Sequence, residues 1–158
     1  MRAIVQRVTQ ASVTVNEELI SNIGKGICVL VGISRDDTDK DIEYIVRKLL
    51  NLRIWDGENG KRWQHSVSQK KYEILCVSQF TLYNVLKGNS PDFHHAMAAT
   101  ESKAFFDKFI STLKSAYEPD LVKEGKFGNY MQVHIQNDGP VTIQLESPIA
   151  KHGDSVAK

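Results

Sequence analysis

Two short runs of almost continuously apolar residues constrain the fold of this chain more than any other feature. The first covers Ile27 to Ile33 and the second covers Ile74 to Val77. Neither run alternates between apolar and polar residues, so each predicts a central strand that is buried on both faces. Each contains one cysteine, Cys28 and Cys76, which we interpret as core thiols because free cysteine behaves as a small buried hydrophobe.

Two helices are predicted from apolar residues at helical spacing. Thr38, followed three residues later by Asp41, resembles a capping box at the start of the first helix. The apolar face of that helix comprises Ile42, Ile45, Val46, Leu49 and Leu50. The second helix is expected from about Thr100 to Tyr117, and Pro119 ends it.

The remaining N-terminal residues predict β-structure. Ala3–Val8 and Ser12–Val15 are expected to form a hairpin, and Glu18–Ile23 a third, more exposed strand. The residues from Asp56 to Gly60 contain two turn dipeptides and predict a loop or hairpin. Asn84–Thr100 has no clear period and predicts a long loop, which in a compact domain is usually functional.

The C-terminal part alternates strictly between apolar and polar residues in two stretches. Apolar residues occupy every second position from Met131 to Ile135 and again from Val141 to Leu145. The segment Asn137 to Pro140 separates the two stretches. The pattern therefore predicts a half-buried hairpin whose turn contains Gly139-Pro140.

These elements predict one mixed α/β (α+β) domain over residues 1–150, with antiparallel-rich β-sheets forming a barrel-like core and two main helices. A chain of 158 residues is long enough for one core, and no linker divides it. Residues 151–158 are polar and are expected to form a disordered tail. The N-terminus does not resemble a signal peptide, and no segment approaches the roughly 18 apolar residues of a membrane span, so we expect a cytoplasmic protein.

Several classes of chemistry lack support in the sequence. The five histidines show no His-x-x-x-His spacing, and the cysteines form no Cys-x-x-Cys motif. Gly-x-Ser-x-Gly and glycine-rich phosphate loops are also absent from the sequence. We therefore expect neither a metal nor a cofactor. A net charge of +1 argues against nonspecific nucleic-acid binding but permits a local patch that contacts one end of an RNA.

Two short motifs could carry chemistry. Ser78 and Thr81 place hydroxyl groups just past the end of a buried strand, where side chains can enter a pocket. A nucleophile there would need an adjacent general base, and the alternative is that the hydroxyls bind the turn backbone. Gly139-Pro140 is either a plain turn or a rigid recognition element, since X-Pro bonds adopt the cis form at low cost.

Four segments resemble, in the same order, the D-aminoacyl-tRNA deacylase family. They are Met1–Val8, Ser78–Leu82, Lys126–Gly128 and Asn137–Thr142. The resemblance covers about residues 1 to 148, and four motifs in order are far more specific than any one alone. The segment Asn89–Phe93 is closer to eukaryotic members of the family than to bacterial ones.

The resemblance implies a homodimer that hydrolyses the ester joining a D-amino acid to the 3′-terminal adenosine of tRNA. It also implies removal of glycine mischarged on tRNA, for example on alanine tRNA. In the family the Gly-Pro bond is cis and reaches into the active site of the opposite subunit, where its carbonyls exclude an L side chain. A rigid wall of this kind is the natural means of rejecting the wrong enantiomer.

The resemblance also assigns site residues. The catalytic motif comprises Ser78, Gln79, Phe80 and Thr81. The substrate-binding residues comprise Gly139, Pro140, Phe127, Met131, Arg7 and Ser102; at Ser102 relatives often carry alanine. We favour water attack assisted by the ribose 2′-hydroxyl, with the protein positioning the substrate and supplying backbone N–H groups, and with Thr81 mainly structural. The alternatives are a DNA-binding module without hydrolase chemistry and a small-molecule esterase or amidase that uses Ser78 or Thr81.

Overall fold

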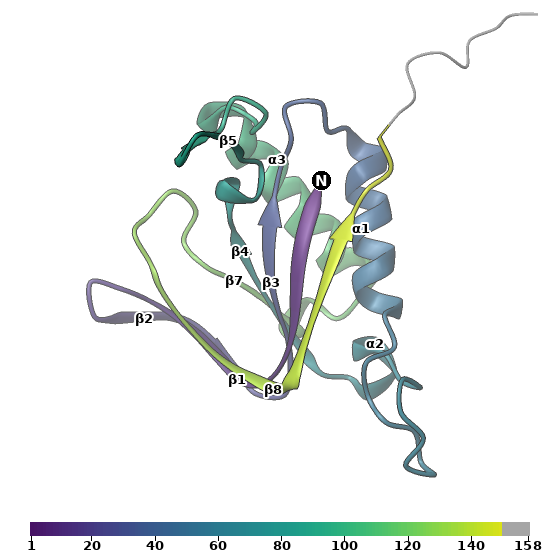
Figure 1. The fold of residues 1–158 in the computed structure, drawn as a ribbon. Coiled ribbons are helices and arrows are strands. Elements are labelled where there is room, and N and C mark those ends of the chain that lie inside the picture. Colours follow the sequence, from purple (N-terminus) through teal and green to yellow (C-terminus); the bar gives the residue numbers. More distant parts are fainter. Residues whose placement is uncertain (150–158) are drawn as a thin grey trace, which may run out of the picture.

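The fold consists of a strongly curved sheet with helices against one face (Figure 1). The computed structural model describes residues 1–149. The sheet has the order β2-β1-β3-β4-β7, with β8 also paired to β1, and its strands are β1 (Arg2–Val15), β2 (Glu18–Ile23), β3 (Gly26–Gly32), β4 (Glu73–Ser78), β7 (Val122–Glu124) and β8 (Gln132–Glu146). β1 is antiparallel to β2, β3 and β8, whereas β3–β4 and β4–β7 are parallel pairs. The predicted mixed α/β domain with an antiparallel-rich, barrel-like sheet is confirmed.

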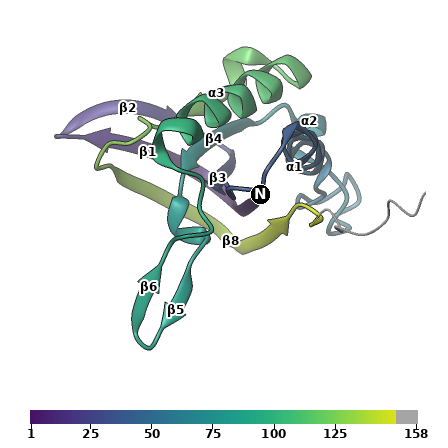
Figure 2. The ribbon, with the colours of Figure 1, turned by 90° about the horizontal axis from the view of Figure 1, so that it is seen from above.

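The two predicted helices are present as α1 (Asp39–Asn51) and α3 (Ala99–Ala116), and a four-residue α2 (Val67–Lys70) lies between them in the chain. The predicted capping box of Thr38 and Asp41 is also present. Both long helices bury their apolar faces against the sheet (Figure 2), where Ile45 and Phe109 have no exposed surface. Among the helices of residues 1–149, none is long and apolar enough to cross a membrane.

β3 and β4 are buried on both faces, as their apolar runs predict. Ile27, Val29 and Cys76 point into the core beneath the helices. Cys28 and Leu75 point into a second core, which is covered by β2 and by the halves of β1 and β8 that fold over this face of the sheet. Burial raises the pKa of the Cys28 thiol to about 12, which is consistent with a packing role for this cysteine.

The predicted N-terminal hairpin is wrong. β1 is one continuous strand of 14 residues, and the chain first reverses at Asn16 and Glu17, which both have a positive φ. The register between β1 and β8 shifts on each side of Val8. These irregularities in strand pairing, rather than a turn, interrupt the alternation of apolar and polar residues in this part of β1.

The predicted C-terminal hairpin is also wrong. β8 is a single strand, and both of its halves pair with β1, from Arg2 opposite Glu146 to Thr14 opposite Gln132. Strict alternation cannot distinguish two strands of a hairpin from one long strand, because the period is the same. Gly139-Pro140 lies in a bulge where four residues of β8, Asp138 to Val141, oppose the single residue Arg7 of β1.

The expected long loop contains a small two-stranded hairpin. β5 (Val85–Lys87) and β6 (Ser90–Asp92) pair around Gly88, and the hairpin projects from the body of the molecule (Figure 2). Strands of three exposed residues have too little alternation to be recognised in the sequence. Two 3₁₀ turns complete the fold, η1 (Phe80–Leu82) and η2 (Pro119–Leu121). The predicted tail, residues 151–158, lies outside the described residues.

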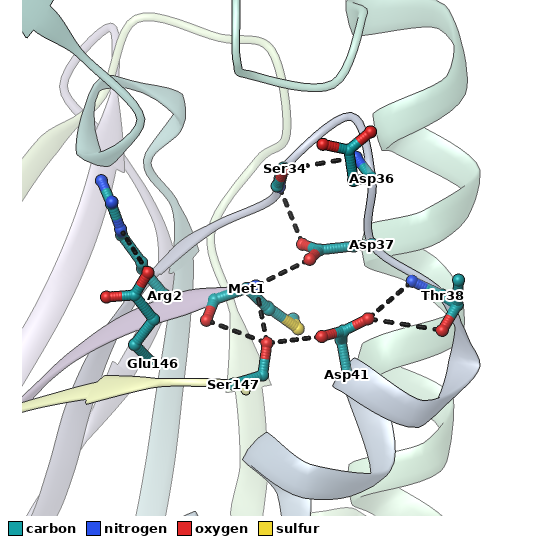
Figure 3. Close-up of polar contacts among 9 residues, drawn as sticks. All are labelled: Met1, Arg2, Ser34, Asp36, Asp37, Thr38, Asp41, Glu146 and Ser147. Carbon is teal, nitrogen blue, oxygen red and sulfur yellow. Dashed lines mark hydrogen bonds and ion pairs between the residues drawn. The ribbon is translucent and has the colours of Figure 1, made fainter. Parts of the chain in front are cut away.

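A polar network joins the start of β1, the start of α1 and the end of β8 (Figure 3). The buried Met1 ammonium donates hydrogen bonds to Asp37 Oδ1 (2.7 Å) and to Ser147 Oγ (2.8 Å). The Ser147 hydroxyl donates to Asp41 Oδ1 (2.6 Å), while Asp41 Oδ2 accepts the Thr38 N–H (2.8 Å). Burial alone would raise the pKa of Asp41, but the hydrogen bonds from Ser147 and Thr38 outweigh it, and the pKa is lowered.

Asp41→Asn is expected to lower the free energy of unfolding by about 1 kcal/mol at neutral pH, since the carboxylate of the capping box is lost. The lowered pKa means that Asp41 contributes its stability above the ordinary value of 3.8, and that the contribution disappears as the pH falls through the lowered value. The difference between the variant and the wild type in urea unfolding should therefore shrink below about pH 4. An equal difference at pH 7 and pH 3 would contradict this, and the exposed Asp36→Asn is the control.

Candidate active site

The end of β4 is held tightly against β3. The Gln79 N–H donates to the Val31 carbonyl (2.7 Å), and the Leu82 N–H donates back to the Gln79 carbonyl (3.2 Å), which closes η1. Gly32 permits the close approach of η1, because a Cβ there would lie 2.8 Å from the Cβ of Leu82. The segment that begins at Ser78 is thus fixed by the backbone of two neighbouring strands.

The side chains of this segment resemble a binding surface more than a nucleophilic site. Gln79 Nε2 donates to Thr81 Oγ1. Within residues 1–149, neither a histidine nor a carboxylate hydrogen-bonds to the hydroxyl of Ser78 or Thr81. Phe80 is 57% exposed, and its ring meets Phe93 edge-on at a centroid distance of 5.1 Å. An exposed aromatic ring in a fixed orientation can bind a planar ligand.

Phe127 and Ser102 lie toward the same end of the sheet. β7 is parallel to β4, with Glu124 opposite Cys76, so the chain leaves both strands at this end. The half-buried Phe127 packs on Phe106 of α3 with a centroid distance of 5.6 Å. Ser102 is buried in the first turn of α3, and its hydroxyl donates to the Ala99 carbonyl (3.3 Å).

Met131 anchors the loop that carries Phe127. The Met131 sulfur accepts the Lys126 N–H (3.3 Å) and would lie 2.9 Å from a Cβ at Gly125. The Gly125 N–H in turn donates to the Cys76 carbonyl of β4 (3.0 Å). Seven of the predicted site residues therefore gather toward one end of the sheet, and we call them the strand-end group: Ser78, Gln79, Phe80, Thr81, Ser102, Phe127 and Met131.

The other three predicted residues form a second site at the bulge of β8. The Gly139-Pro140 peptide bond is cis, Gly139 has a φ of +128°, and both residues are exposed. The guanidinium of Arg7 donates from Nε to the Asp138 carbonyl (3.1 Å) and from Nη1 to the Ile54 carbonyl (2.6 Å). Arg7 therefore joins this segment to the backbone at Ile54.

Asn137 closes the bulge from the inside. Its Oδ1 accepts the Val141 N–H (3.1 Å), and its Nδ2 donates to Thr142 Oγ1 (2.9 Å). A side chain at Gly139 would approach Val141 Cγ2 to 3.0 Å and Arg7 Nη2 to 3.1 Å. The backbone of Gly139-Pro140 is therefore exposed to solvent yet fixed from both sides.

The two motifs lie at opposite ends of β3 and β4: Arg7 pairs with Ile27 at the start of β3, and Ser78 ends β4. Ser78 pairs with Val31, and Val31 pairs with Ala3 at the start of β1. Arg7 lies four residues further along β1, which corresponds to about 13 Å of strand. Within one chain, Ser78 and Gly139-Pro140 thus lie far apart along the strands.

Comparison with known proteins identifies the family. The model of the D-Tyr-tRNA(Tyr) deacylase family matches residues 4–146. The chain belongs to this family. Among the relatives of this deacylase chain, the human D-aminoacyl-tRNA deacylase 1 is 64% identical over 94% of this chain and 71% of that protein. The Drosophila melanogaster D-aminoacyl-tRNA deacylase is 58% identical over 98% of this chain and 97% of its own length.

Two solved structures share the fold of this chain. A structure described as the c-Myc DNA Unwinding Element Binding Protein is 63% identical and superposes with a TM-score of 0.92, covering 94% of this chain and all of that one. A probable eukaryotic D-amino acid tRNA deacylase is 24% identical with a TM-score of 0.78, over 91% of this chain and 97% of that one, a likeness of fold. The resemblance seen in the sequence is confirmed, and this member of the family is a hydrolase.

A cavity beside Gly139-Pro140 contains residues that the sequence did not indicate as site residues. Ile54, Arg62 and Trp63 line a cavity of about 300 Å³ together with Arg7, Asp56, Gly139, Pro140 and Val141. Nothing in the sequence relates residues 54–63 to residues 139–141. The available signal was weak: a tryptophan in a polar turn-rich loop.

Proposed function

We propose that this chain hydrolyses the ester bond of D-aminoacyl-tRNA, releasing the free D-amino acid and tRNA, and that it rejects L-aminoacyl-tRNA. The observation that carries the proposal is the division of the site. An exposed and rigid Gly139-Pro140 segment lies level with the start of β3, and the strand-end group lies beyond the end of β4. In a family of tRNA deacylases, this division fits an active site that two subunits share.

A homodimer would complete the site. β8 runs for 15 residues and, within residues 1–149, pairs only with β1, which leaves a long edge open. Its apolar side chains remain partly exposed, among them Val133, Ile143 and Leu145. Proteins seldom leave a long strand edge uncovered. A second copy on this side would cover the edge and could carry Gly139-Pro140 to the strand-end group of its partner.

The backbone of Gly139-Pro140 suits selection between enantiomers. A D- and an L-amino acid differ in which side of the α-carbon carries the side chain and which carries hydrogen. A rigid wall against one side admits hydrogen and rejects a side chain, and such steric rejection does not depend on which side chain is present. Glycine carries hydrogen on both sides, so the same wall would admit glycine mischarged on tRNA.

The chemistry we propose is water attack assisted by the 2′-hydroxyl of the terminal ribose. Thr81 has a hydrogen bond from Gln79 but, in the described part of the chain, no base to activate it as a nucleophile. η1 begins at Phe80, and the first N–H groups of a helical turn have no partner within the turn. The Phe80 and Thr81 N–H groups can therefore stabilise the oxyanion, while Phe80 and Phe127 hold the adenosine.

The test compares D-tyrosyl-tRNA with L-tyrosyl-tRNA under the same conditions. We expect rapid loss of the D ester and a rate for the L ester close to that of the uncatalysed reaction. Equal loss of both esters, or of neither, would contradict the proposed function.

Thr81→Ala is expected to retain activity within about tenfold of the wild type, because its hydroxyl mainly orients Gln79, and one neutral hydrogen bond contributes about 1 kcal/mol. The measurement is the single-turnover rate on D-tyrosyl-tRNA. A complete loss of activity in a folded variant, with labelling of Thr81 in the wild type by an acyl probe, would instead support covalent catalysis by a hydroxyl.

DNA binding is the second candidate, since the name of one closely similar solved structure describes a DNA-binding protein. The net charge of +1 gives no general affinity for duplex DNA. Titration of a labelled duplex at two salt concentrations tests this candidate. Tight, salt-sensitive binding would support it, and weak binding at both concentrations would reject it.

A further inference from the structure

The loop from Asp56 to Trp63 is structurally joined to Gly139-Pro140. The Arg7 guanidinium donates to carbonyls on both sides, Ile54 at the base of the loop and Asp138 in the bulge. The loop and the bulge also line one cavity of about 300 Å³. Any movement that brings Gly139-Pro140 to a substrate therefore brings this loop as well.

Trp63 lines that cavity and is exposed to solvent. Its side chain is 53% exposed, and its φ of +62° places it in the left-handed region, which is unfavourable for a bulky residue. The conformation is maintained from both sides: Gln64 Nε2 donates to the carbonyls of Arg62 (3.1 Å) and Trp63 (3.3 Å). Paired backbone bonds between Trp55 and His65 close the loop at its base. An exposed indole held in a strained backbone indicates a surface with a binding role.

Charged side chains accompany Trp63 in the cavity. Arg7 and Arg62 line the cavity with a single carboxylate, that of Asp56. The Asp138 carboxylate is 3.5 Å from Arg7 Nε and offsets its charge, while Arg62 precedes Trp63 directly in the chain. An aromatic ring next to an arginine is the combination that proteins use to bind unpaired nucleotides, through stacking on the base and pairing with the phosphate.

We propose that Trp63 and Arg62 bind the unpaired nucleotide that precedes the terminal adenosine of the tRNA, in the active site of the partner subunit. The inference rests on the proposed function, in which Gly139-Pro140 reaches the amino acid across the dimer. The Trp63 indole stacks on the base, and the Arg62 guanidinium pairs with the phosphate that links this nucleotide to the adenosine. The loop thus binds the single-stranded end of the tRNA, while Gly139-Pro140 contacts the amino acid.

The test compares D-tyrosyl-tRNA with D-tyrosyl-adenosine, which lacks this nucleotide together with the rest of the tRNA. Trp63→Ala is expected to raise KM for the tRNA about tenfold, with kcat within about twofold of the wild type, since the variant loses the stacking of the base on the aromatic ring. On D-tyrosyl-adenosine the variant and the wild type should be equal. Trp63→Phe should restore most of the affinity for tRNA. Leu19→Ala, which removes another exposed apolar side chain, is the control.

The possible outcomes separate this inference from the proposed function. An equal loss on both substrates, no loss on either, or dissociation of the Trp63→Ala dimer in sedimentation would overturn the inference while leaving the function intact. A wild-type protein that hydrolyses neither substrate would refute the proposed function, and the inference with it.

Discussion

Replacement of Gly139 by alanine is expected to lower the ratio of D- to L-aminoacyl-tRNA deacylation by about 100-fold. At a φ of +128°, Gly139 has a conformation that L residues rarely adopt, and a Cβ would approach Val141 and Arg7 to about 3 Å. The backbone of the bulge must therefore move, and a displacement of about 1 Å in an active site can change a rate by about 100-fold. Initial rates on the two tyrosyl-tRNA enantiomers provide the ratio.

Gly88→Ala is the matched control for this variant. Gly88 also has a positive φ, +62°, but a Cβ there would meet no atom within 4 Å, and the residue lies in the turn between β5 and β6. Its ratio of D to L rates should equal that of the wild type. An unchanged ratio in folded Gly139→Ala would show that the bulge does not select the enantiomer.

Arg7→Ala is expected to lower the rate on D-aminoacyl-tRNA by about 100-fold. The variant loses two hydrogen bonds from a charged donor, to the carbonyls of Ile54 and Asp138, and each such bond contributes about 1.5–3 kcal/mol. Without them the bulge is no longer fixed to the neighbouring loop. Arg7→Lys should not restore the rate, since an ammonium group lacks the planar fork that reaches both carbonyls.

Gln6→Ala tests whether any disturbance of this part of β1 has the same effect. Gln6 is the neighbouring residue and also contacts β8, through Thr142 Oγ1 at 3.5 Å, but it does not touch the bulge. We expect its rate and its enantiomer ratio within about twofold of the wild type. Similar losses in Gln6→Ala and Arg7→Ala would mean that Arg7 acts only through the stability of the strand.

The parts of the fold that were predicted correctly are those in which burial determines composition. β3 and β4 are covered on both faces, so nearly every side chain is apolar and the strands stand out in the sequence. α1 has one buried face and a capping box at its start, and both appear as local patterns. In these elements the sequence contains the signal because each residue responds to its own surroundings.

The prediction failed where the structure depends on which strands pair. The alternation in β1 and β8 is the same in one long strand as in a hairpin, and only the mutual pairing of residues 2–14 with 132–146 shows that each is continuous. The candidate site residues, and the separation of Gly139-Pro140 from the rest of the site, were predicted from the residues and the family resemblance. The strand register that separates them within one chain was not predicted. The proximity of Trp63 to Pro140 was not predicted either, because it depends on a contact between a loop and a strand that are far apart in the sequence.

The claim that Gly139-Pro140 acts across a dimer interface is tested most directly with heterodimers. One chain carries Gly139→Ala, and the other carries Phe80→Ala together with Phe127→Ala, so that only the first chain retains the aromatic rings proposed to hold the adenosine. If Gly139-Pro140 acts in the partner's site, the one working site contains an intact Gly139. The heterodimer is then predicted to show the wild-type ratio of D to L deacylation at about half of the wild-type rate per dimer. A heterodimer with the lowered ratio of Gly139→Ala would contradict the account.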